Sequence, residues 1–429
     1  MSILKRALEL ALYWVVSAIV RGTSLLLPSR SRAPAPPTVT ILLMNAWAIG
    51  GTIRATLQLA GLLAETHEVE VVSVIRRRDK PLFEFPTGVT VTALDDRRAS
   101  VADRRGRAQR LLGAVGGRLL HPGDRARLGT TLWTDLQLLR TLWRIREGVL
   151  LGTRPGLNLL ALDAAPRGVT VVGAEHMHYS AHSRAMRVEI RRRYPALDAL
   201  VVLTEHDRRE YHDLLGDRTP VVRIPNAVPA ARQAPPSLTE PVVLGAGRLT
   251  PQKGFDLLID AFAAIAAEYP EWRLRICGRG PYRAALERQA EERGVADRVT
   301  LAGQARNLEQ EMGHASLFAL SSRFEGLPMV LLEAMRSGLA VVSFDCPTGP
   351  GEVIRHARDG VLVTNGDVRS FAHAMGELMS DEAARRRLGA AARAKAAEYS
   401  PAAVGPQWQS LLATVQSGGF QPNSPTMRA

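Results

Sequence analysis

The sequence predicts an α/β protein built from two successive domains, each a doubly wound parallel sheet. Its 429 residues exceed what one ordinary hydrophobic core holds, so two domains are expected. Short apolar, β-branched runs alternate with helical patterns along both halves, which is typical of parallel βα units. A Pro- and Ala-rich stretch, Val228–Pro241, separates the two series. We therefore expect an interdomain linker there, with domains at 38–232 and 240–400.

The chain begins with an apolar run, Ala7–Val20, bounded by basic residues. Fourteen residues are too few for an ordinary transmembrane helix, and a secretory cleavage site is not evident. We interpret residues 1–37 as an amphipathic helix followed by a linker at Ser29–Pro37. The helix is expected to lie in a membrane interface, with Tyr13 and Trp14 at the headgroups. The alternative is a leader helix packed on the protein itself.

The first domain is expected to open with a strand at Val39–Met44, followed by Gly50-Gly51 and a helix at Thr52–Glu65. A strand, a glycine turn and a helix start together form an approach site for phosphate or sugar. Residues 100–150 are Arg-rich and helix-prone. Further strands are predicted at Val69–Ile75, Val89–Leu94, Thr170–Ala174 and Leu200–Leu203.

Two groups of possible metal ligands occur in this domain. His176, His178 and His182 follow a predicted strand, but a single loop without a matching carboxylate is weak support for a metal. One of these histidines is better interpreted as a substrate contact. Asp95-Asp96, beside Arg97-Arg98, is interpreted as a pair of turn or surface acids. We expect no metal site.

The second domain restarts with a strand at Val242–Ala246, a loop Gly247–Gly254 and a helix at Phe255–Glu268. Its loop holds Arg248 and Lys253. Only four lysines occur in the chain (Lys5, Lys80, Lys253 and Lys395), so a lysine here suggests that a compact point charge is needed. Together the two cations suit a diphosphate. The remaining strands are predicted at Arg273–Cys277, Val299–Leu301, Leu317–Leu320 and Ala340–Ser343.

The segment SSRFEGLPMVLLEAM, Ser321–Met335, holds two glutamates. Pro328 fits the first turn of a helix and Gly338 the position just past its end. Glu325 then precedes the helix, and Glu333 lies about a turn and a half inside an apolar segment, where a carboxylate needs a partner. The two acids would then lie near the backbone N–H groups of the segment Gly326–Met329. Together these groups predict a site for a ligand with hydroxyls and negative charge. The alternative is a capped core helix with one accidental acid.

Charge and cysteine content narrow the function. Residues 1–240 hold 34 Lys and Arg against 22 Asp and Glu, whereas residues 241–429 hold 21 against 20, so the net charge of +13 lies in the first half. A basic surface attracts phosphates or anionic lipids, but aromatic residues do not interleave the arginines, which disfavours nucleic acid. Cys277 and Cys346 are expected to be buried thiols.

GRLTPQKGFDLLIDAF, ICGRGP, LAGQARN and SRFEGLPMVLLEAMRSGLAVVS resemble the donor half of family 4 glycosyltransferases. The resemblance is specific over Val242–Leu362 and looser in NAWAIGGTIRATLQLA and AEHMHYS of the first half. It implies the GT-B fold, two Rossmann-like domains around a cleft, and transfer with retention. It also implies that the segment 401–416 is a helix crossing back to the first domain, and residues 417–429 are expected to be disordered.

The resemblance also implies roles for individual residues. Arg248 and Lys253 match the cations that hold the donor diphosphate. Glu325 matches the glutamate beside the donor sugar and Glu333 the one that binds the ribose, with Gly326, Leu327 and Pro328 in the same motif. The Gly50-Gly51 loop would meet the diphosphate or the acceptor, and His176 would contact the sugar near the reacting carbon.

The loop Asp345–Glu352 resembles loops of bacterial transferases that use UDP-sugars, which favours a UDP-hexose or UDP-N-acetylhexosamine over GDP-mannose. The expected acceptor is a glycan, a lipid-linked glycan or a teichoic-acid-type polymer, with the enzyme in the cytoplasm at the inner face of the cell membrane. Two alternatives stay open: a nucleotide-sugar epimerase of the same architecture, and a non-catalytic sugar-nucleotide-binding protein. An oxidoreductase is disfavoured, because GAGRL lacks the third glycine of a dinucleotide fingerprint.

Overall fold

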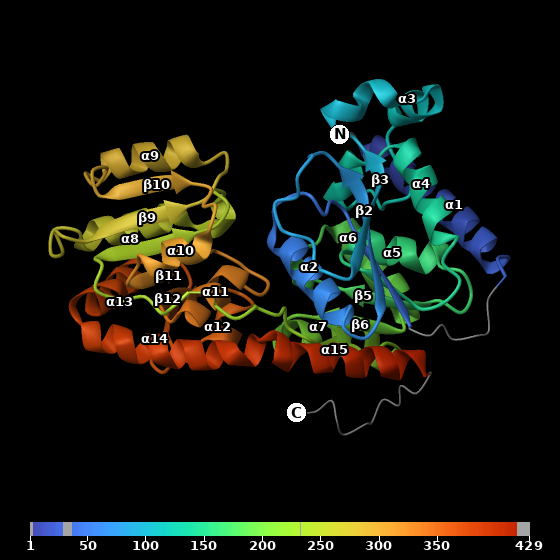
Figure 1. The fold of residues 1–429 in the computed structure, drawn as a ribbon. Helices are drawn as coiled ribbons and strands as arrows, with labels where there is room; N and C mark the ends of the chain where they lie inside the picture. Colours follow the sequence, from blue (N-terminus) through green and yellow to red (C-terminus); the bar gives the residue numbers. More distant parts are fainter. Residues whose placement is uncertain (1–2, 29–36, 232, 418–429) are drawn as a thin grey trace. The chain divides into compact units, whose positions relative to one another are not determined.

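The computed structural model describes residues 3–28, 37–231 and 233–417. These form two compact units, one from the N-terminus to Ile224 together with residues from Gly405 onward, and one spanning Pro225–Val404. Each unit is an α/β domain (Figure 1). Most of the predicted linker (29–36) and almost all of the C-terminal tail (418–429) lie outside the described residues.

The first unit contains a seven-stranded sheet in the order β3-β2-β1-β4-β5-β6-β7, with every adjacent pair parallel. The central strands are buried on both faces, as expected where helices cover a parallel sheet. The strand order reverses between β1 and β4, which defines the topological switch point of this sheet. The strands are β1 Thr38–Leu43, β2 Glu68–Arg76, β3 Val89–Asp96, β4 Val149–Gly152, β5 Thr170–Ala174, β6 Ala199–Val202 and β7 Val221–Arg223.

Helices connect these strands and enclose a core that includes Leu42, Leu138, Leu160 and Tyr211. Their starts follow local chemistry: the Thr131 side chain caps α4, and the Thr204 side chain caps α7. The helices are α2 Gly51–Leu63, α3 Arg107–Gly113, α4 Leu132–Leu142, α5 Pro155–Ala164, α6 Arg184–Arg193 and α7 Glu205–Leu215.

Helix α1, Ile3–Leu25, packs on α5 (Figure 1). Its inner face carries Tyr13, Ser17, Val20 and Ser24, all less than a tenth exposed. Tyr13 packs edge-on against a buried histidine, so the expectation that it lies at lipid headgroups is wrong. The stretch Ala7–Leu25 is long and apolar enough to cross a membrane by length and composition, but one face of it is part of the domain.

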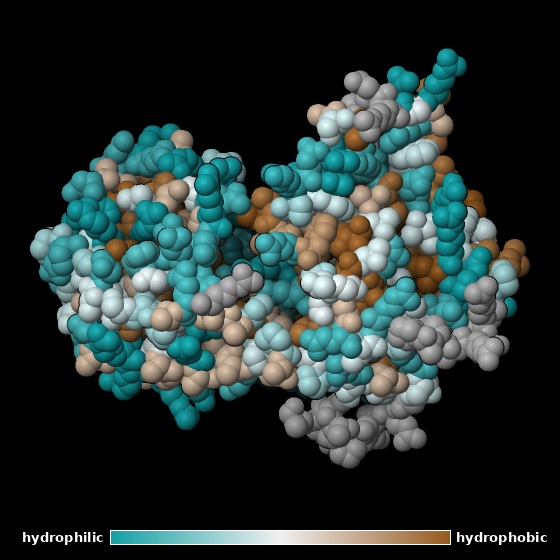
Figure 2. Space-filling model, viewed as in Figure 1, coloured by the Kyte–Doolittle hydropathy of each residue, from teal (hydrophilic) through white to brown (hydrophobic). Residues whose placement is uncertain are grey.

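The outer face of α1 is also apolar. Leu8, Leu12, Val15 and Ile19 are all exposed by 40% or more and recur at helical spacing. In Figure 2 hydrophobic residues reach the surface where Figure 1 places this helix. The two interpretations of the sequence therefore describe opposite faces of one helix.

The second unit contains a six-stranded parallel sheet in the order β10-β9-β8-β11-β12-β13, with its switch point between β8 and β11. The strands are β8 Val242–Ala246, β9 Arg273–Cys277, β10 Val299–Gly303, β11 Leu317–Leu320, β12 Ala340–Asp345 and β13 Val361–Thr364. The helices are α8 Phe255–Ile265, α9 Arg283–Glu292, α10 Leu308–Gly313, α11 Met329–Ser337, α12 Pro350–Val353, α13 Val368–Ser380, α14 Glu382–Ala396 and α15 Pro401–Gln416.

The start of the second unit differs from the prediction. The stretch predicted as a linker, Val228–Pro241, belongs to that unit rather than separating the two. The amide of Val228 donates to the carbonyl of Tyr399 at 2.7 Å, and the carbonyl of Pro229 accepts from Arg336. Proline-rich composition therefore marks a chain without secondary structure, but one that is hydrogen-bonded to its domain. Helix α15 begins in the second unit, and its residues from Gly405 group with the first.

The structure also corrects the interpretation of Asp95 as a turn or surface acid. Asp95 lies in β3 and is only 3% exposed, because Arg97 and the Thr134 hydroxyl both donate to its Oδ2, at 2.7 and 2.8 Å. Asp96 remains at the surface, paired with Arg98. Burial of an acid is tolerated when its partners come with it, and that pairing is invisible in the sequence.

Candidate donor site at the switch point of the second sheet

The loop after β8 is shaped by glycines. Gly254 ends a short turn with φ 60°, a left-handed conformation that favours glycine. A β-carbon there would lie 2.0 Å from the carbonyl oxygen of Ser321, in the loop after β11. Only glycine therefore permits the two loops to touch. The Ser321 hydroxyl donates to the carbonyl of Lys253 at 3.1 Å, which fixes the contact.

This contact brings Lys253 and Glu325 together. The Lys253 Nζ lies 2.5 Å from Glu325 Oε1, and the Ser322 hydroxyl donates to the same oxygen at 2.6 Å. Both charged side chains are largely buried, with 15% and 8% exposure. The sequence predicted both residues as site residues but not that they would form an ion pair.

Arg248, on the same loop, is exposed, and its Nη2 contacts Gln252 Oε1 at 3.4 Å. Gln252 in turn donates to the carbonyl of Phe324, next to Glu325. Arg248 is thus linked through Gln252 to the Glu325 loop and is open to solvent, so an anion arriving from water can reach it.

The helix predicted after Glu325 is present as α11. Pro328 is its N-cap residue and Gly338, with φ 87°, ends it. The Leu331 amide already donates to the Pro328 carbonyl at 2.9 Å, which leaves the amides of Met329 and Val330 as the donors that the first turn can offer to a ligand. Glu333 is inside the helix and only 5% exposed. It has an interaction partner in the structure, so it is not an isolated buried charge.

A third loop, after β12, closes against the first two. The Thr348 hydroxyl donates to the carbonyl of Glu325, and Thr348 itself has φ 64°, uncommon for a residue with a branched side chain. Gly349 has φ 89°, and a β-carbon there would lie 2.1 Å from the carbonyl of Gly326. Backbone strain of this kind concentrates at functional sites. Ser322 and Thr348 were not predicted as site residues, because their only signal in the sequence is that they stand in the loops around Glu325 and Gly349.

Loops after β8 and β11 flank the switch point of the second sheet, where ligands of such sheets bind. One exposed cation, one paired cation and a helix N-terminus favour a diphosphate. Two buried carboxylates supply acceptors for hydroxyl groups. Burial also raises the pKa of the neighbouring Cys346 thiol to about 12, so that it stays neutral and apolar beside Glu325.

In the first unit, Gly50 and Gly51 lie at the start of α2, after β1 and at the switch point of the first sheet. Gly50 is extended (φ 163°), and a side chain there would meet only Ile53. The loop is therefore open to a ligand from the solvent side. Whether it meets the loops of the second unit stays a prediction.

His176 lies two residues past the end of β5, after Glu175. The residue is partly exposed, but its Nδ1 is buried and has no hydrogen-bond partner among the described residues. Burial lowers the pKa of His176 to about 4, so the ring is neutral at physiological pH. A neutral imidazole with an unsatisfied nitrogen suits a substrate hydroxyl.

Behind His176 lies a buried polar network. Glu175 is 3% exposed and accepts from Asn158 at 3.0 Å and from the Tyr194 hydroxyl. Its other oxygen lies 3.5 Å from His182 Nε2, an ion-pair distance rather than a well-formed hydrogen bond. Burial disfavours protonation of His182, but Glu175 more than offsets it, so the pKa of His182 is raised. The network holds the strand end that carries His176.

The three histidines considered as metal ligands have separate environments. In the part of the chain that the structure describes, His, Cys, Asp and Glu side chains form no group of three that would hold a metal ion. His182 pairs with Glu175, whereas the Nδ1 of His176 has no hydrogen-bond partner among the described residues.

Comparison with solved structures defines the fold class. The Staphylococcus aureus protein TarM, in complex with Fondaparinux, alpha-GlcNAc-glycerol and UDP, is 14% identical, with a TM-score of 0.72 over 88% of this chain and 99% of its own. The pneumococcal O-GlcNAc transferase GtfA, in complex with UDP and GlcNAc, gives 0.69 over 89% of this chain and 99% of its own, at 14% identity. The chain therefore has the GT-B fold of two Rossmann-like domains.

Sequence comparison places the glycosyltransferase signature in the second unit. Residues 229–395, less than half of the chain, match the family described as glycosyl transferases group 1. An exopolysaccharide phosphotransferase of Streptomyces coelicolor is 34% identical over 91% of this chain, but the chain spans only 42% of that protein's length. The amylovoran biosynthesis glycosyltransferase of Erwinia amylovora is 27% identical over 56% of this chain and 70% of its own.

A GDP-mannose-dependent phosphatidylinositol monomannoside mannosyltransferase of Mycolicibacterium smegmatis is 29% identical over 58% of this chain and 71% of its own. The named relatives therefore include a protein called a phosphotransferase and proteins called glycosyltransferases, and the solved structures hold UDP.

Proposed function

We propose that the protein is a retaining glycosyltransferase of family 4. It moves a hexose or an N-acetylhexosamine from a nucleotide diphosphate sugar to a glycan, lipid-linked or teichoic-acid-type acceptor. The observation that carries the proposal is the pairing of Lys253 with Glu325 beside Arg248, at the switch point of the second sheet. The family match over residues 229–395 supports the same reaction class.

Breaking a sugar–diphosphate bond builds negative charge on the leaving phosphate and positive charge on the sugar ring. Arg248, Lys253 and the first turn of α11 would stabilise the leaving group. The carboxylate of Glu325, held by Ser322 and Lys253, would stabilise the ring. No metal is needed for charge neutralisation if these groups act together.

The other residues bind and orient. Glu333, buried in α11, would accept hydrogen bonds from the ribose hydroxyls. The neutral His176 imidazole would contact the sugar near the reacting carbon, and Gly50-Gly51 would admit the diphosphate or the acceptor. The acceptor hydroxyl then attacks from the face that the phosphate leaves, which retains the configuration.

We favour a UDP-sugar as donor, because the solved structures of this fold named above hold UDP. The mannosyltransferase relatives make GDP-mannose the competing donor. An assay of nucleotide release by the full chain distinguishes the two donors. It offers UDP-glucose, UDP-galactose, UDP-N-acetylglucosamine and GDP-mannose separately, each with a bacterial glycolipid extract. Release from GDP-mannose alone would overturn the choice of UDP.

The same assay separates the alternative classes. An epimerase would interconvert the sugar of the donor without an acceptor, which mass spectrometry with isotopic exchange detects. A binding protein would bind UDP but turn over no donor with any extract. The buried Lys253–Glu325 pair favours transfer, because a binding site alone does not require a carboxylate beside the sugar.

We also propose that the protein attaches peripherally to the inner face of the cell membrane through α1. Leu8, Val15 and Ile19 point outward with exposures of 69%, 57% and 63%. Trp14 donates to Glu189 of α6 at 2.9 Å, and the exposed Arg192 of α6 lies 4.0 Å from the same carboxylate, so Arg192 lies close to α1. An apolar helix face with a cation nearby suits an anionic lipid surface.

A further inference from the structure

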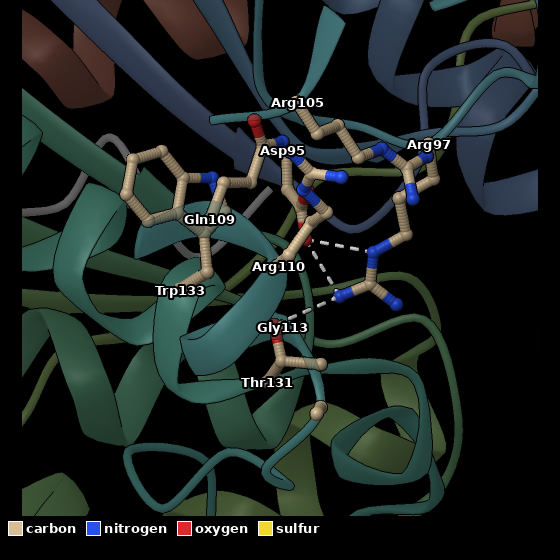
Figure 3. A pocket seen from close by; sticks show the side chains of 9 residues that line it. Asp95, Arg97, Arg105, Gln109, Arg110, Gly113, Thr131 and Trp133 are labelled. Carbon is tan, nitrogen blue, oxygen red and sulfur yellow. Dashed lines mark hydrogen bonds and ion pairs between the residues drawn. The ribbon is translucent and has the colours of Figure 1, made fainter. Parts of the chain in front are cut away.

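A polar cavity lies in the first unit, at the carboxyl end of the edge strand β3. Its volume is about 380 Å³, within the range of small-ligand sites. Figure 3 shows the side chains that surround it, which come from β3, from α3 and the loop before it, and from the start of α4. The lining residues are Asp95, Arg97, Arg105, Gln109, Arg110, Gly113, Ala114, Thr131 and Trp133.

The three arginines of this cavity are not equivalent. Arg97 is committed to the fold, since it donates to Asp95 and Thr134 at 2.7 and 2.8 Å and to the carbonyl of Gly129. Asp95 is the one acid of the lining, and Arg97 already neutralises it.

Arg105 and Arg110 carry the unbalanced charge. The Nε of Arg105 is buried and has no hydrogen-bond partner among the described residues. A buried donor without a partner is costly unless a ligand satisfies it. In Figure 3 the guanidinium groups of Arg97, Arg105 and Arg110 converge, and Gln109 lies beside them. Among the described residues neither Arg105 nor Arg110 has an acidic partner, so their two guanidinium groups offer a fork for a phosphate or a carboxylate.

Trp133 also lines the cavity, and in Figure 3 its indole lies on the Gln109 side of the guanidinium groups. An indole near two neighbouring arginines favours a ligand with an apolar ring face as well as a negative charge. A pyranose that carries a phosphate or a carboxylate has both features, whereas a bare inorganic anion has only the second.

The cavity shares a sheet edge with the first-unit residues of the proposed site. β3 lies two strands from β1, so about 10 Å of sheet edge separates the cavity from Gly50-Gly51. If the proposed acceptor approaches Gly50-Gly51, a group bound in the cavity would lie away from the reacting hydroxyl. The donor residues Arg248, Lys253 and Glu325 belong to the other unit.

We propose that this cavity is an acceptor subsite for an acidic sugar, recognised by Arg105 and Arg110 with Trp133 against the ring. This inference rests on the proposed transfer to a glycan and narrows it: the acceptor bears a phosphate or a carboxylate at a distance from the attacked hydroxyl.

Binding to the full chain without nucleotide tests the subsite directly. The probes are glucose 6-phosphate, glucuronate, glucose and inorganic phosphate, measured by ligand-observed NMR. We expect one of the two acidic sugars to bind more tightly than glucose and inorganic phosphate, and the preferred one identifies the anion as phosphate or carboxylate. Arg105→Gln with Arg110→Gln should weaken that binding at least tenfold, whereas Arg107→Gln, an exposed neighbour outside the lining, should leave it unchanged.

The subsite would be overturned if glucose bound as tightly as both acidic sugars. It would also be overturned if the double variant kept both its affinity for the acidic sugar and its melting temperature. Trp133→Leu should weaken binding of the acidic sugar without affecting binding of inorganic phosphate, and equal losses would also contradict the assignment.

The outcomes for transfer are separate. If donor turnover is absent but the acidic sugar still binds, the proposed function fails and the subsite stands. If turnover is present and the double variant leaves the KM for an acidic acceptor unchanged, only the subsite fails.

Discussion

Replacing Asp163 with asparagine should release α1 from the first unit without unfolding it. Asp163 is only 4% exposed and holds three partners: the Ser17 hydroxyl at 2.5 Å, Arg21 at 3.0 Å and Arg193 at 2.5 Å. The asparagine keeps the shape but removes the charge. Two of the three partners, Ser17 and Arg21, belong to α1 itself, so the loss falls on the docking of this helix.

The magnitude follows from the partners. Hydrogen bonds to charged groups contribute about 1.5–3 kcal/mol each. Arg21 is nearly half exposed, so water screens its share and it counts little. Arg193 is 11% exposed and would face a neutral amide, which adds a cost for its unpaired charge. We expect a loss of about 3 kcal/mol, which corresponds to a factor of about 10² in local opening.

Hydrogen exchange measured by mass spectrometry reads this opening in peptides that cover residues 7–25. They should exchange about a hundredfold faster in Asp163→Asn, while peptides from β1 and β4 keep wild-type rates. Glu9→Gln is the matched control, because Glu9 and Arg127 form a partly exposed pair of the same helix and its loss should cost less than about 1 kcal/mol. Wild-type exchange over residues 7–25 in Asp163→Asn would refute the argument that the carboxylate anchors α1.

Three further outcomes are expected. Gly349→Ala should lower turnover at least tenfold with the fold retained, because its β-carbon enters the Glu325 loop. Gly366→Ala is the control: its φ is a similar 82°, but it stands in open space and should keep turnover near wild type. Equal rates in the two variants would contradict the clash. Leu8→Ser with Ile19→Ser should reduce co-sedimentation with phosphatidylglycerol vesicles several-fold at an unchanged melting temperature, and undiminished sedimentation would exclude α1 as the contact. The raised pKa of His182 adds stability that is complete below about pH 6.5 and is lost as pH rises through the folded-state pKa. The melting temperature of the wild type should therefore fall more between pH 6 and 8 than that of His182→Gln. Parallel curves of melting temperature against pH would contradict this.

The second sheet was predictable from the sequence almost strand by strand. The expected strands Val242–Ala246, Arg273–Cys277 and Leu317–Leu320 agree with the structure at both ends. Val242–Ala246 and Leu317–Leu320 are short apolar runs, and Arg273–Cys277 alternates arginine with apolar residues, so the local pattern agrees with the buried parallel sheet. β4, β7 and β13, of three or four residues each, were not predicted. A run this short carries little pattern, although β11, also of four residues, was predicted.

The candidate site was predictable in its members but not in its pairings. A rare lysine and an acid in a glycine loop identified Lys253 and Glu325, yet their 2.5 Å contact depends on Gly254 permitting two loops to touch. Arg105 and Arg110 looked like ordinary solvated arginines in a basic stretch. Their convergence with Trp133 depends on how α3 and α4 pack, which sequence spacing does not encode.

The central claim is that Lys253, Arg248 and Glu325 form a donor site that breaks a sugar–diphosphate bond. The most direct measurement is nucleotide release by wild type, Lys253→Ala and Glu325→Gln, with the donor that the wild type uses. Both variants should lose about 10²-fold or more in kcat with the fold retained, while the exposed control Lys80→Ala stays at the wild-type rate. Near wild-type turnover in either Lys253→Ala or Glu325→Gln would contradict the account.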